Sequence, residues 1–164
     1  CAIAIYLFLF LEANYLVALV LFFVASLSDF LDGYIARKTN SESVLGEILD
    51  PIADKLLIVF VLIGLSINLN SFLIGFISAV IISREIWVAA LRDINSRKNQ
   101  SEKTKVTFLA KTKTATQMFA ILMYLFGLTM NNMMILFFAD IILLIALLVT
   151  IQTGFQYTIL TFRK

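Results

Sequence analysis

The chain has 164 residues, of which 61% are hydrophobic and 15% charged, with a formal net charge of +2. This composition lies outside the range of soluble globular domains and is typical of a membrane protein. The absence of histidine and the single cysteine, Cys1, exclude Ser-His-Asp and Cys-His catalysis, histidine-ligated zinc and an intrachain disulfide. The remaining carboxylates, lysines and arginines suit hard cations and phosphates, and no nucleic-acid partner is expected.

Long apolar stretches predict an all-α, polytopic transmembrane bundle that forms a single domain over residues 1–164. Residues 1–11 are apolar but shorter than the roughly 20 residues that cross a bilayer, which predicts a truncated first helix. Transmembrane β-strands are disfavoured because the runs are continuously apolar. Further helices are predicted at 15–38, from 46 or 50 to 67, at 72–93, 108–130 and 133–162, with turns at 68–71 and 131–132 and a basic segment at 94–105.

The charged residues are distributed unevenly along this series of hairpins. All thirteen lysines and arginines fall at the same predicted end, and the opposite turns contain none. By the positive-inside rule, that end is expected to face the cytoplasm. Asp29, Asp32, Asp50 and Asp54 lie at the same end, so we expect a site that opens to the cytoplasm near the lipid headgroups.

These four carboxylates predict a cation site. Ionisable groups at membrane depth are costly unless they are paired, metal-bound or facing a polar cavity. Asp29 and Asp32 are three apart and Asp50 and Asp54 four apart, so each pair shares a helix face, and antiparallel neighbouring helices would bring both pairs into one cleft. Two Mg²⁺ or Mn²⁺ ions about 4 Å apart would offset the repulsion and could stabilise a phosphoryl displacement.

Each carboxylate also has a structural interpretation. Asp50 before Pro51 fits a helix N-cap, Asp32 with Gly33 fits a turn, and Asp54 with Lys55 fits an interfacial ion pair. If all of these interpretations held, carboxylates with unrelated structural roles would have gathered by chance at one membrane interface. A shared cation site is therefore favoured.

Three neighbouring residues suit a phosphate ligand. Gly33 and Gly46 leave room for a ligand to approach the backbone, and Arg37 is able to hold a phosphate with two hydrogen bonds.

The spacing of these residues has a known counterpart. The pattern D-x-x-D-G-x-x-A-R-x8-G-x-x-x-D-x-x-x-D runs without a mismatch from Asp29 to Asp54. It is the signature of the CDP-alcohol phosphatidyltransferases, which the chain therefore resembles. The resemblance implies a six-helix membrane enzyme, usually a homodimer, that transfers a phosphatidyl group from a CDP-linked lipid to an alcohol and releases CMP.

The resemblance also implies residue roles. Asp29, Asp32 and Asp50 would bind two divalent metal ions, and Asp54 would contact the second ion and act as general base on the acceptor hydroxyl. The residues implied to contact the CDP-lipid are Asp29, Gly33, Arg37 and Gly46.

Segments outside the motif resemble the bacterial phosphatidylglycerophosphate synthases of this family. They include Ser83-Arg-Glu-Ile86, Leu91-Arg92 and Lys111-Thr-Lys-Thr114, with a weaker similarity at Gly154-Phe-Gln-Tyr157. The chain differs in its truncated first helix and in Ala110, where glycine is common. The implied substrates are CDP-diacylglycerol and glycerol 3-phosphate within a membrane lipid environment.

Three cations are candidates for binding an acceptor that carries its own phosphate: Arg84, Lys111 and Lys113. Arg84 lies within an apolar helix, where a charge is costly. The alternative is a buried ion pair with Glu85, although adjacent residues on a helix do not face each other well. For the two lysines, anchoring to anionic headgroups is an equally open interpretation.

Two other functions remain open. Within the same family, the acceptor could be inositol phosphate, or phosphatidylglycerol in cardiolipin synthesis. A divalent-cation transporter would need carboxylates along a path across the bilayer; the clustering at one interface argues against it, whereas Asp140, away from the cluster, keeps it open. For Asp140, an interhelical hydrogen bond or a local cavity is expected.

Overall fold

The computed structural model describes residues 14–39, 44–97 and 108–162, and all regular structure in these ranges is helical. Side chains are described there except at 29–51, 54 and 108–111. The helices are α2 (Tyr15–Thr39), α3 (Val44–Asn68), α4 (Phe72–Arg97), α5 (Phe108–Met130) and α6 (Met133–Phe162). The all-α prediction is confirmed for these ranges, whereas the truncated first helix, and with it a count of six, falls outside the described residues.

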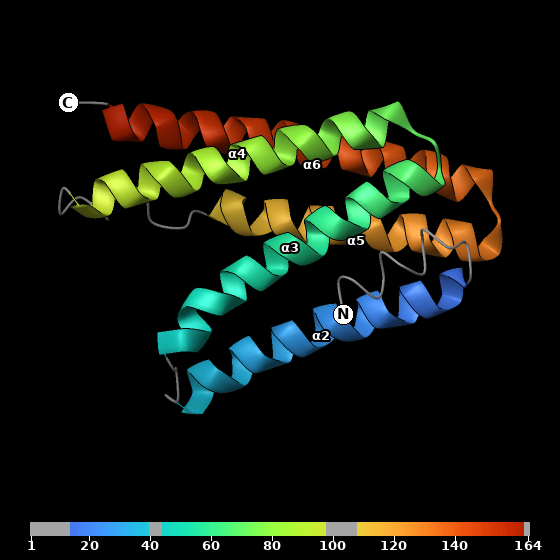
Figure 1. Cartoon of the computed structure of the whole chain (residues 1–164), viewed down its shortest axis with the longest axis horizontal. Helices are drawn as coiled ribbons and strands as arrows, with labels where there is room; N and C mark the ends of the chain where they lie inside the picture. Colours follow the sequence, from blue (N-terminus) through green and yellow to red (C-terminus); the bar gives the residue numbers. More distant parts are fainter. Residues whose placement is uncertain (1–13, 40–43, 98–107, 163–164) are drawn as a thin grey trace.

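Helix α5 lies at the centre of the bundle, where it contacts α2, α3 and α6, while α4 contacts α3 and α6. Figure 1 shows α2 on one side of the molecule and α4 with α6 on the other. The helix ends at residues 39, 44, 97, 108 and 162 gather at one end, and the two tight turns lie at the opposite end. The predicted alternation of helix direction is therefore confirmed, and in the hairpins α3–α4 and α5–α6 the two helices pack against each other.

The core that joins the helices is apolar. Each helix contributes at least one fully buried side chain: Phe22, Leu62, Ile77, Ile121 and Leu143. In a lipid environment, close packing of such side chains, rather than removal from water, holds helices together.

The turn between α5 and α6 explains why the predicted boundary at residues 131–132 matches the structure. Asn131 has a positive φ of 48°, a conformation that asparagine tolerates better than most residues. The side-chain Oδ1 of Asn132 accepts hydrogen bonds from the backbone N–H groups of Met134 at 2.9 Å and Ile135 at 3.4 Å. One asparagine thus ends α5 and the other caps α6.

The start of α3 corrects one interpretation of the sequence. The helix begins at Val44, so Asp50 lies well inside it and the N-cap interpretation of Asp50 is wrong. Pro51 is consequently an internal helical residue, where it can donate no backbone hydrogen bond. The end of helix α4 also differs from the prediction: the helix ends at Arg97 and not at Asp93.

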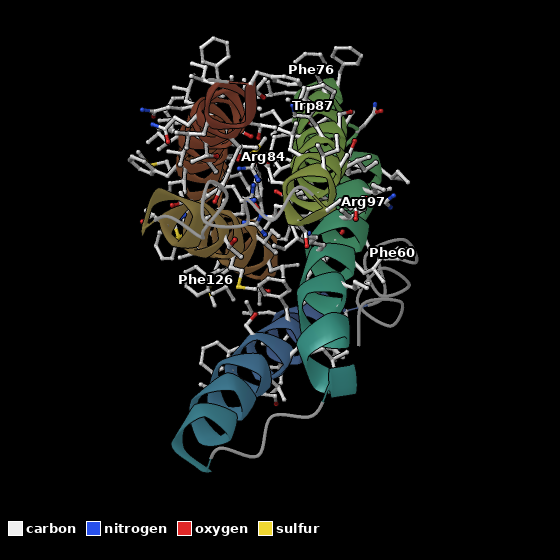
Figure 2. All side chains as sticks on the ribbon, turned by 90° about the vertical axis from the view of Figure 1, so that its left-hand side faces the viewer. Phe60, Phe76, Arg84, Trp87, Arg97 and Phe126 are labelled. Carbon is white, nitrogen blue, oxygen red and sulfur yellow. The ribbon has the colours of Figure 1, made fainter. Side chains whose placement is uncertain are left out.

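The outer surface supports a membrane location. Helices α4 and α6 are long and apolar enough to cross a bilayer, and only 28% and 22% of their apolar windows are buried within the protein. Core helices of soluble proteins bury most of their surface, so this exposure favours lipid as the surrounding medium. Large side chains including Phe60, Phe76, Trp87 and Phe126 project from the outside of the bundle (Figure 2).

Candidate functional site

The aspartate motif lies on two consecutive helices. Asp29 and Asp32 belong to α2, Asp50 and Asp54 to α3, and the backbone is helical at all four positions. Helical spacing therefore places the members of each pair on one face of their helix, as the proposed metal ions require.

The side chains of the motif are not among those described. This applies to the four aspartates and to Gly33, Arg37, Gly46 and Lys111, so their convergence on one cleft stays a prediction. Among the side chains that are described, no group of three or more acidic or cysteine residues could hold a metal ion.

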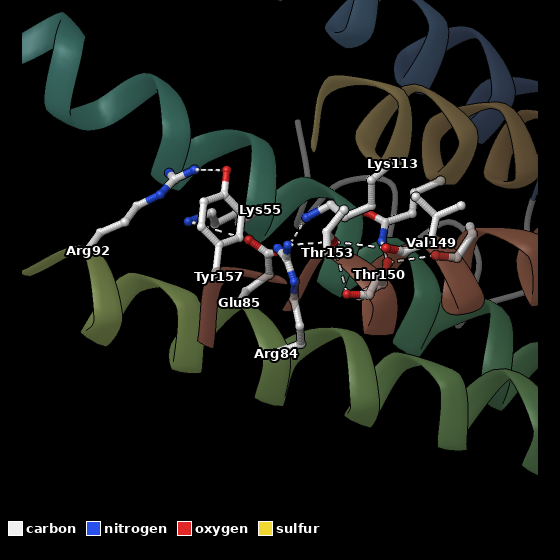
Figure 3. Close-up of polar contacts among 11 residues, drawn as sticks. Lys55, Arg84, Glu85, Arg92, Lys113, Val149, Thr150, Thr153 and Tyr157 are labelled. Atoms are coloured by element: carbon white, nitrogen blue, oxygen red, sulfur yellow. Dashed lines mark hydrogen bonds and ion pairs between the residues drawn. The ribbon is translucent and has the colours of Figure 1, made fainter. Parts of the chain in front are cut away.

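A buried group of charged side chains lies between α3, α4 and α5 (Figure 3). We call Lys55, Arg84, Glu85 and Lys113 the cationic cluster. Oε1 of Glu85 accepts a hydrogen bond from Nη1 of Arg84 at 2.8 Å and another from Nζ of Lys113, and its Oε2 lies 3.6 Å from Nζ of Lys55. Among the described side chains, three cations thus surround one carboxylate, which is an excess of two formal positive charges.

Burial increases the weight of these charges. The exposed fraction of the side chain is 9% for Arg84, 16% for Glu85 and 7% for Lys113, whereas that of Lys55 is 44%. Charges removed from water interact more strongly and are screened less by salt. An arrangement with excess positive charge at this depth is suited to binding an anion.

Helix α6 holds the guanidinium of Arg84 in place. Its Nη2 donates to Oγ1 of Thr153 at 2.7 Å, and the guanidinium carbon lies 6.0 Å from the centre of the Tyr157 ring. Gly154 makes this approach possible, since a Cβ there would lie 3.1 Å from Cγ of Arg84. The Nε of Arg84 is buried and has no hydrogen-bond partner among the described residues, and it would lie 3.5 Å from a Cβ at Gly154, so it faces α6.

Tyr157 links Arg84 to a second arginine. Nη2 of Arg92 donates to the hydroxyl of Tyr157 at 3.3 Å, and its guanidinium carbon lies 5.3 Å from the ring centre. Both arginines can therefore interact with the ring of one tyrosine. The sequence similarity at residues 154–157 thus corresponds to residues that position the two arginines.

A cavity of about 480 Å³ adjoins the cluster between α3, α4 and α5. Lys55, Glu85 and Lys113 form part of its polar lining, and Gln117 lies on the same wall. Most other lining residues are apolar, among them Leu56 and Ile82. The cavity provides space beside the buried charges for a small ligand.

Two expectations for the acceptor site need correction. Lys113 does not anchor to headgroups, because its side chain is buried and pairs with Glu85. Adjacent residues Arg84 and Glu85 do pair, although helical neighbours usually face apart; Thr153 and Lys113 draw the two side chains to the same side.

Sequence reasoning missed the roles of Lys55 and Tyr157, and it did not foresee that Glu85 would be shared by three cations. The available signal was the placement of Glu85, since an acidic residue within an apolar helix requires partners.

Asp140 occupies a different environment. Its Oδ1 accepts a hydrogen bond from the hydroxyl of Tyr124, which joins α5 to α6. The expected interhelical hydrogen bond is therefore confirmed. Asp140 is separated in the chain from the cationic cluster and is not among the residues that line the cavity.

Comparison of the sequence with known proteins shows to which family the chain belongs. The model of the CDP-alcohol phosphatidyltransferase family matches residues 1–152. A CDP-diacylglycerol–glycerol-3-phosphate 3-phosphatidyltransferase of Haemophilus influenzae is 35% identical over 149 residues, covering 90% of this chain and 78% of the relative. A protein of the same name from Rickettsia bellii is 43% identical over 138 residues, covering 84% and 74%. The chain belongs to the CDP-alcohol phosphatidyltransferase family.

Proposed function

We propose that the chain transfers the phosphatidyl group of CDP-diacylglycerol to sn-glycerol 3-phosphate, giving phosphatidylglycerophosphate and CMP in phospholipid biosynthesis. The observation that carries the proposal is the complete motif from Asp29 to Asp54 in a chain whose relatives bear the name of this reaction. The buried excess of positive charge around Glu85 supports an acceptor that has a phosphate of its own.

The aspartates of α2 and α3 suit a pair of divalent ions. Members of the family generally depend on such ions, and we propose Mg²⁺ or Mn²⁺ held by Asp29, Asp32 and Asp50, with Asp54 at the second ion. The helical backbone at all four positions is compatible with this assignment, because residues three or four apart share one face of a helix. When bound, the ions supply positive charge to the diphosphate and to the departing CMP.

In the proposed reaction, Asp54 takes the proton from the acceptor hydroxyl. That oxygen then bonds to the lipid-side phosphorus, and the bond from this phosphorus to the bridging oxygen of CMP breaks. Asp29, Gly33, Arg37 and Gly46 would bind the CDP-lipid so that the two reacting atoms stay aligned. Such positioning supplies much of the rate acceleration in phosphoryl transfer.

The acceptor phosphate would bind at Arg84, Lys111 and Lys113. Arg84 brings a planar guanidinium that can donate two parallel hydrogen bonds to a phosphate. Lys113 shares a carboxylate oxygen with Arg84, so the two donors lie close enough to bind one anion. A neutral acceptor such as serine would leave this charge unused.

The proposal includes a location and an assembly. The apolar helices and the bacterial relatives indicate a membrane protein. We propose a single-domain, multi-pass protein of the cytoplasmic membrane, in contact with membrane lipids, with its active site facing the cytoplasm and a homodimer as the working unit.

Replacing the general base tests the proposed chemistry. We expect Asp54→Asn to reduce CMP release by about 1,000-fold or more, because removal of general-base catalysis alone costs 10²–10⁴-fold and a metal ligand is lost as well. Asp93→Asn is the matched control, since Asp93 is exposed and pairs with Arg97. Normal CMP release by Asp54→Asn would refute the assignment.

A further inference from the structure

The carboxylate of Glu85 occupies the position where the acceptor phosphate is proposed to bind. Oε1 takes hydrogen bonds from both Arg84 and Lys113, and Oε2 faces Lys55 at 3.6 Å. The two described cations assigned to the acceptor are thus already held by an internal anion. A phosphate that enters must take these donors from Glu85 or share them with it.

We infer that Glu85 is a resident anion that keeps the acceptor site assembled and competes with the acceptor phosphate for Arg84 and Lys113. The inference rests on the proposed function and adds to it a positioning residue that sets the affinity for the acceptor. It makes no use of the aspartate motif.

The physical reason is the cost of burying like charges. Without Glu85, Arg84, Lys113 and Lys55 would repel one another in a site largely removed from water, and such unbalanced charges are strongly destabilising. The carboxylate of Glu85 keeps the cations together until a phosphate supplies the negative charge. Like the carboxylate, the phosphate is an anion that accepts hydrogen bonds from arginine and lysine.

The geometry provides an alternative position for the displaced carboxylate. Lys55 is the most exposed member of the cluster and the one farthest from Glu85, at 3.6 Å. When phosphate takes Arg84 and Lys113, the carboxylate can turn towards Lys55 and into the adjoining cavity, which all three of Glu85, Lys55 and Lys113 line. A dianionic phosphate can thereby replace Glu85, whereas a neutral alcohol offers no charge to do so.

The sharpest test removes the charge of Glu85 but keeps its shape. In the full-length protein in detergent or vesicles, we expect Glu85→Gln to lower the KM for glycerol 3-phosphate and the inhibition constant of inorganic phosphate roughly tenfold, because a nearby like charge is gone. The KM for CDP-diacylglycerol should not change. Glu85→Asp retains the charge and should therefore lower the KM for glycerol 3-phosphate less than Glu85→Gln does, while the control Asp93→Asn should match the wild-type protein.

A second measurement does not depend on turnover. Inorganic phosphate should raise the melting temperature of Glu85→Gln more than that of the wild-type protein, because phosphate replaces the missing anion. An unchanged or higher KM together with an equal phosphate effect on melting would overturn the inference, as would a Glu85→Gln protein that stays unfolded with phosphate present. If the wild-type protein transfers no phosphatidyl group, the proposed function fails, while the melting experiment still decides the role of Glu85.

Discussion

Two polar contacts that helix α6 makes with other helices differ in their role within the apolar bundle. At one, the hydroxyl of Tyr124 donates to Asp140, which joins two helices through a single hydrogen bond. At the other, Thr153 contacts Arg84, which belongs to a cluster with three cations for one carboxylate. The first group is paired within the protein, whereas the second has an excess of cations among the described side chains and an adjoining cavity.

The difference separates a structural contact from the proposed acceptor site. Both groups are costly in an apolar environment, so the burial of a charged residue alone does not identify function. The distinguishing features of the cluster are the excess of positive charge among the described side chains and the nearby space for a ligand. The Tyr124–Asp140 pair should affect stability, and the cationic cluster should affect acceptor binding.

The largest effect that tests this comparison is expected from Arg84→Gln. Loss of the guanidinium removes two charged donors from the acceptor site, and hydrogen bonds to charged groups contribute about 1.5–3 kcal/mol each. We expect kcat/KM for glycerol 3-phosphate to fall about 100-fold, measured by steady-state kinetics at saturating CDP-diacylglycerol. Arg97→Gln is the control, because Arg97 lies on the same helix but is exposed. Equal kinetics for the two variants would contradict the assignment of Arg84.

A smaller effect, on stability alone, is expected from Tyr124→Phe. The change leaves the partly buried Asp140 carboxylate without its phenol donor, and we expect a cost of about 1 kcal/mol, the lower end of the range for an unsatisfied buried polar group. We expect a lower free energy of unfolding in detergent and kinetic constants within about twofold of the wild-type values. A large change in KM for glycerol 3-phosphate would show that the pair is linked to the acceptor site and would remove the distinction drawn above.

The smallest effect is expected from Gly154→Ala. The added methyl group would lie 3.1 Å from Cγ of Arg84, so the arginine must shift slightly and its guanidinium becomes misaligned. We expect an increase of about threefold in the KM for glycerol 3-phosphate, since small displacements of positioning groups weaken catalysis. Gly75→Ala is a matched control: its Cβ would lie 2.8 Å from Oγ of Ser66, at the α3–α4 contact. The acceptor KM should respond only to the change at Gly154.

The sequence predicts the helices well where local residues decide the boundary. The ranges of α5 and α6 were predicted as observed, because Asn131 and Asn132 provide both the left-handed turn and the cap. The start of α3 was predicted at residue 46 or 50, because Asp50–Pro51 resembles a helix N-terminus. The helix begins earlier, at Val44. Local capping signals therefore cannot fix a boundary when a helix continues through them.

The candidate site was predictable only in part. Arg84 was identified because a charge within an apolar helix is costly unless it is paired or functional. Lys113 was identified because it lies with Lys111 at the basic start of its helix, and the fixed spacing of the aspartates identified the family. The sharing of Glu85 among three cations depends on contacts between residues far apart in the chain, such as Arg84 with Thr153. No periodicity or spacing in a single sequence reports such contacts. The convergence of the four aspartates stays a prediction.

The most direct test of the proposed function is to identify the lipid product. The purified full-length protein would be given CDP-diacylglycerol and Mg²⁺ or Mn²⁺ with glycerol 3-phosphate, inositol phosphate, phosphatidylglycerol or serine, and the lipids analysed by mass spectrometry. The proposal predicts phosphatidylglycerophosphate and an equal amount of CMP with glycerol 3-phosphate, and loss of both when the divalent ions are chelated. Efficient product formation with another acceptor but not with glycerol 3-phosphate, or no CMP with any of them, would contradict it.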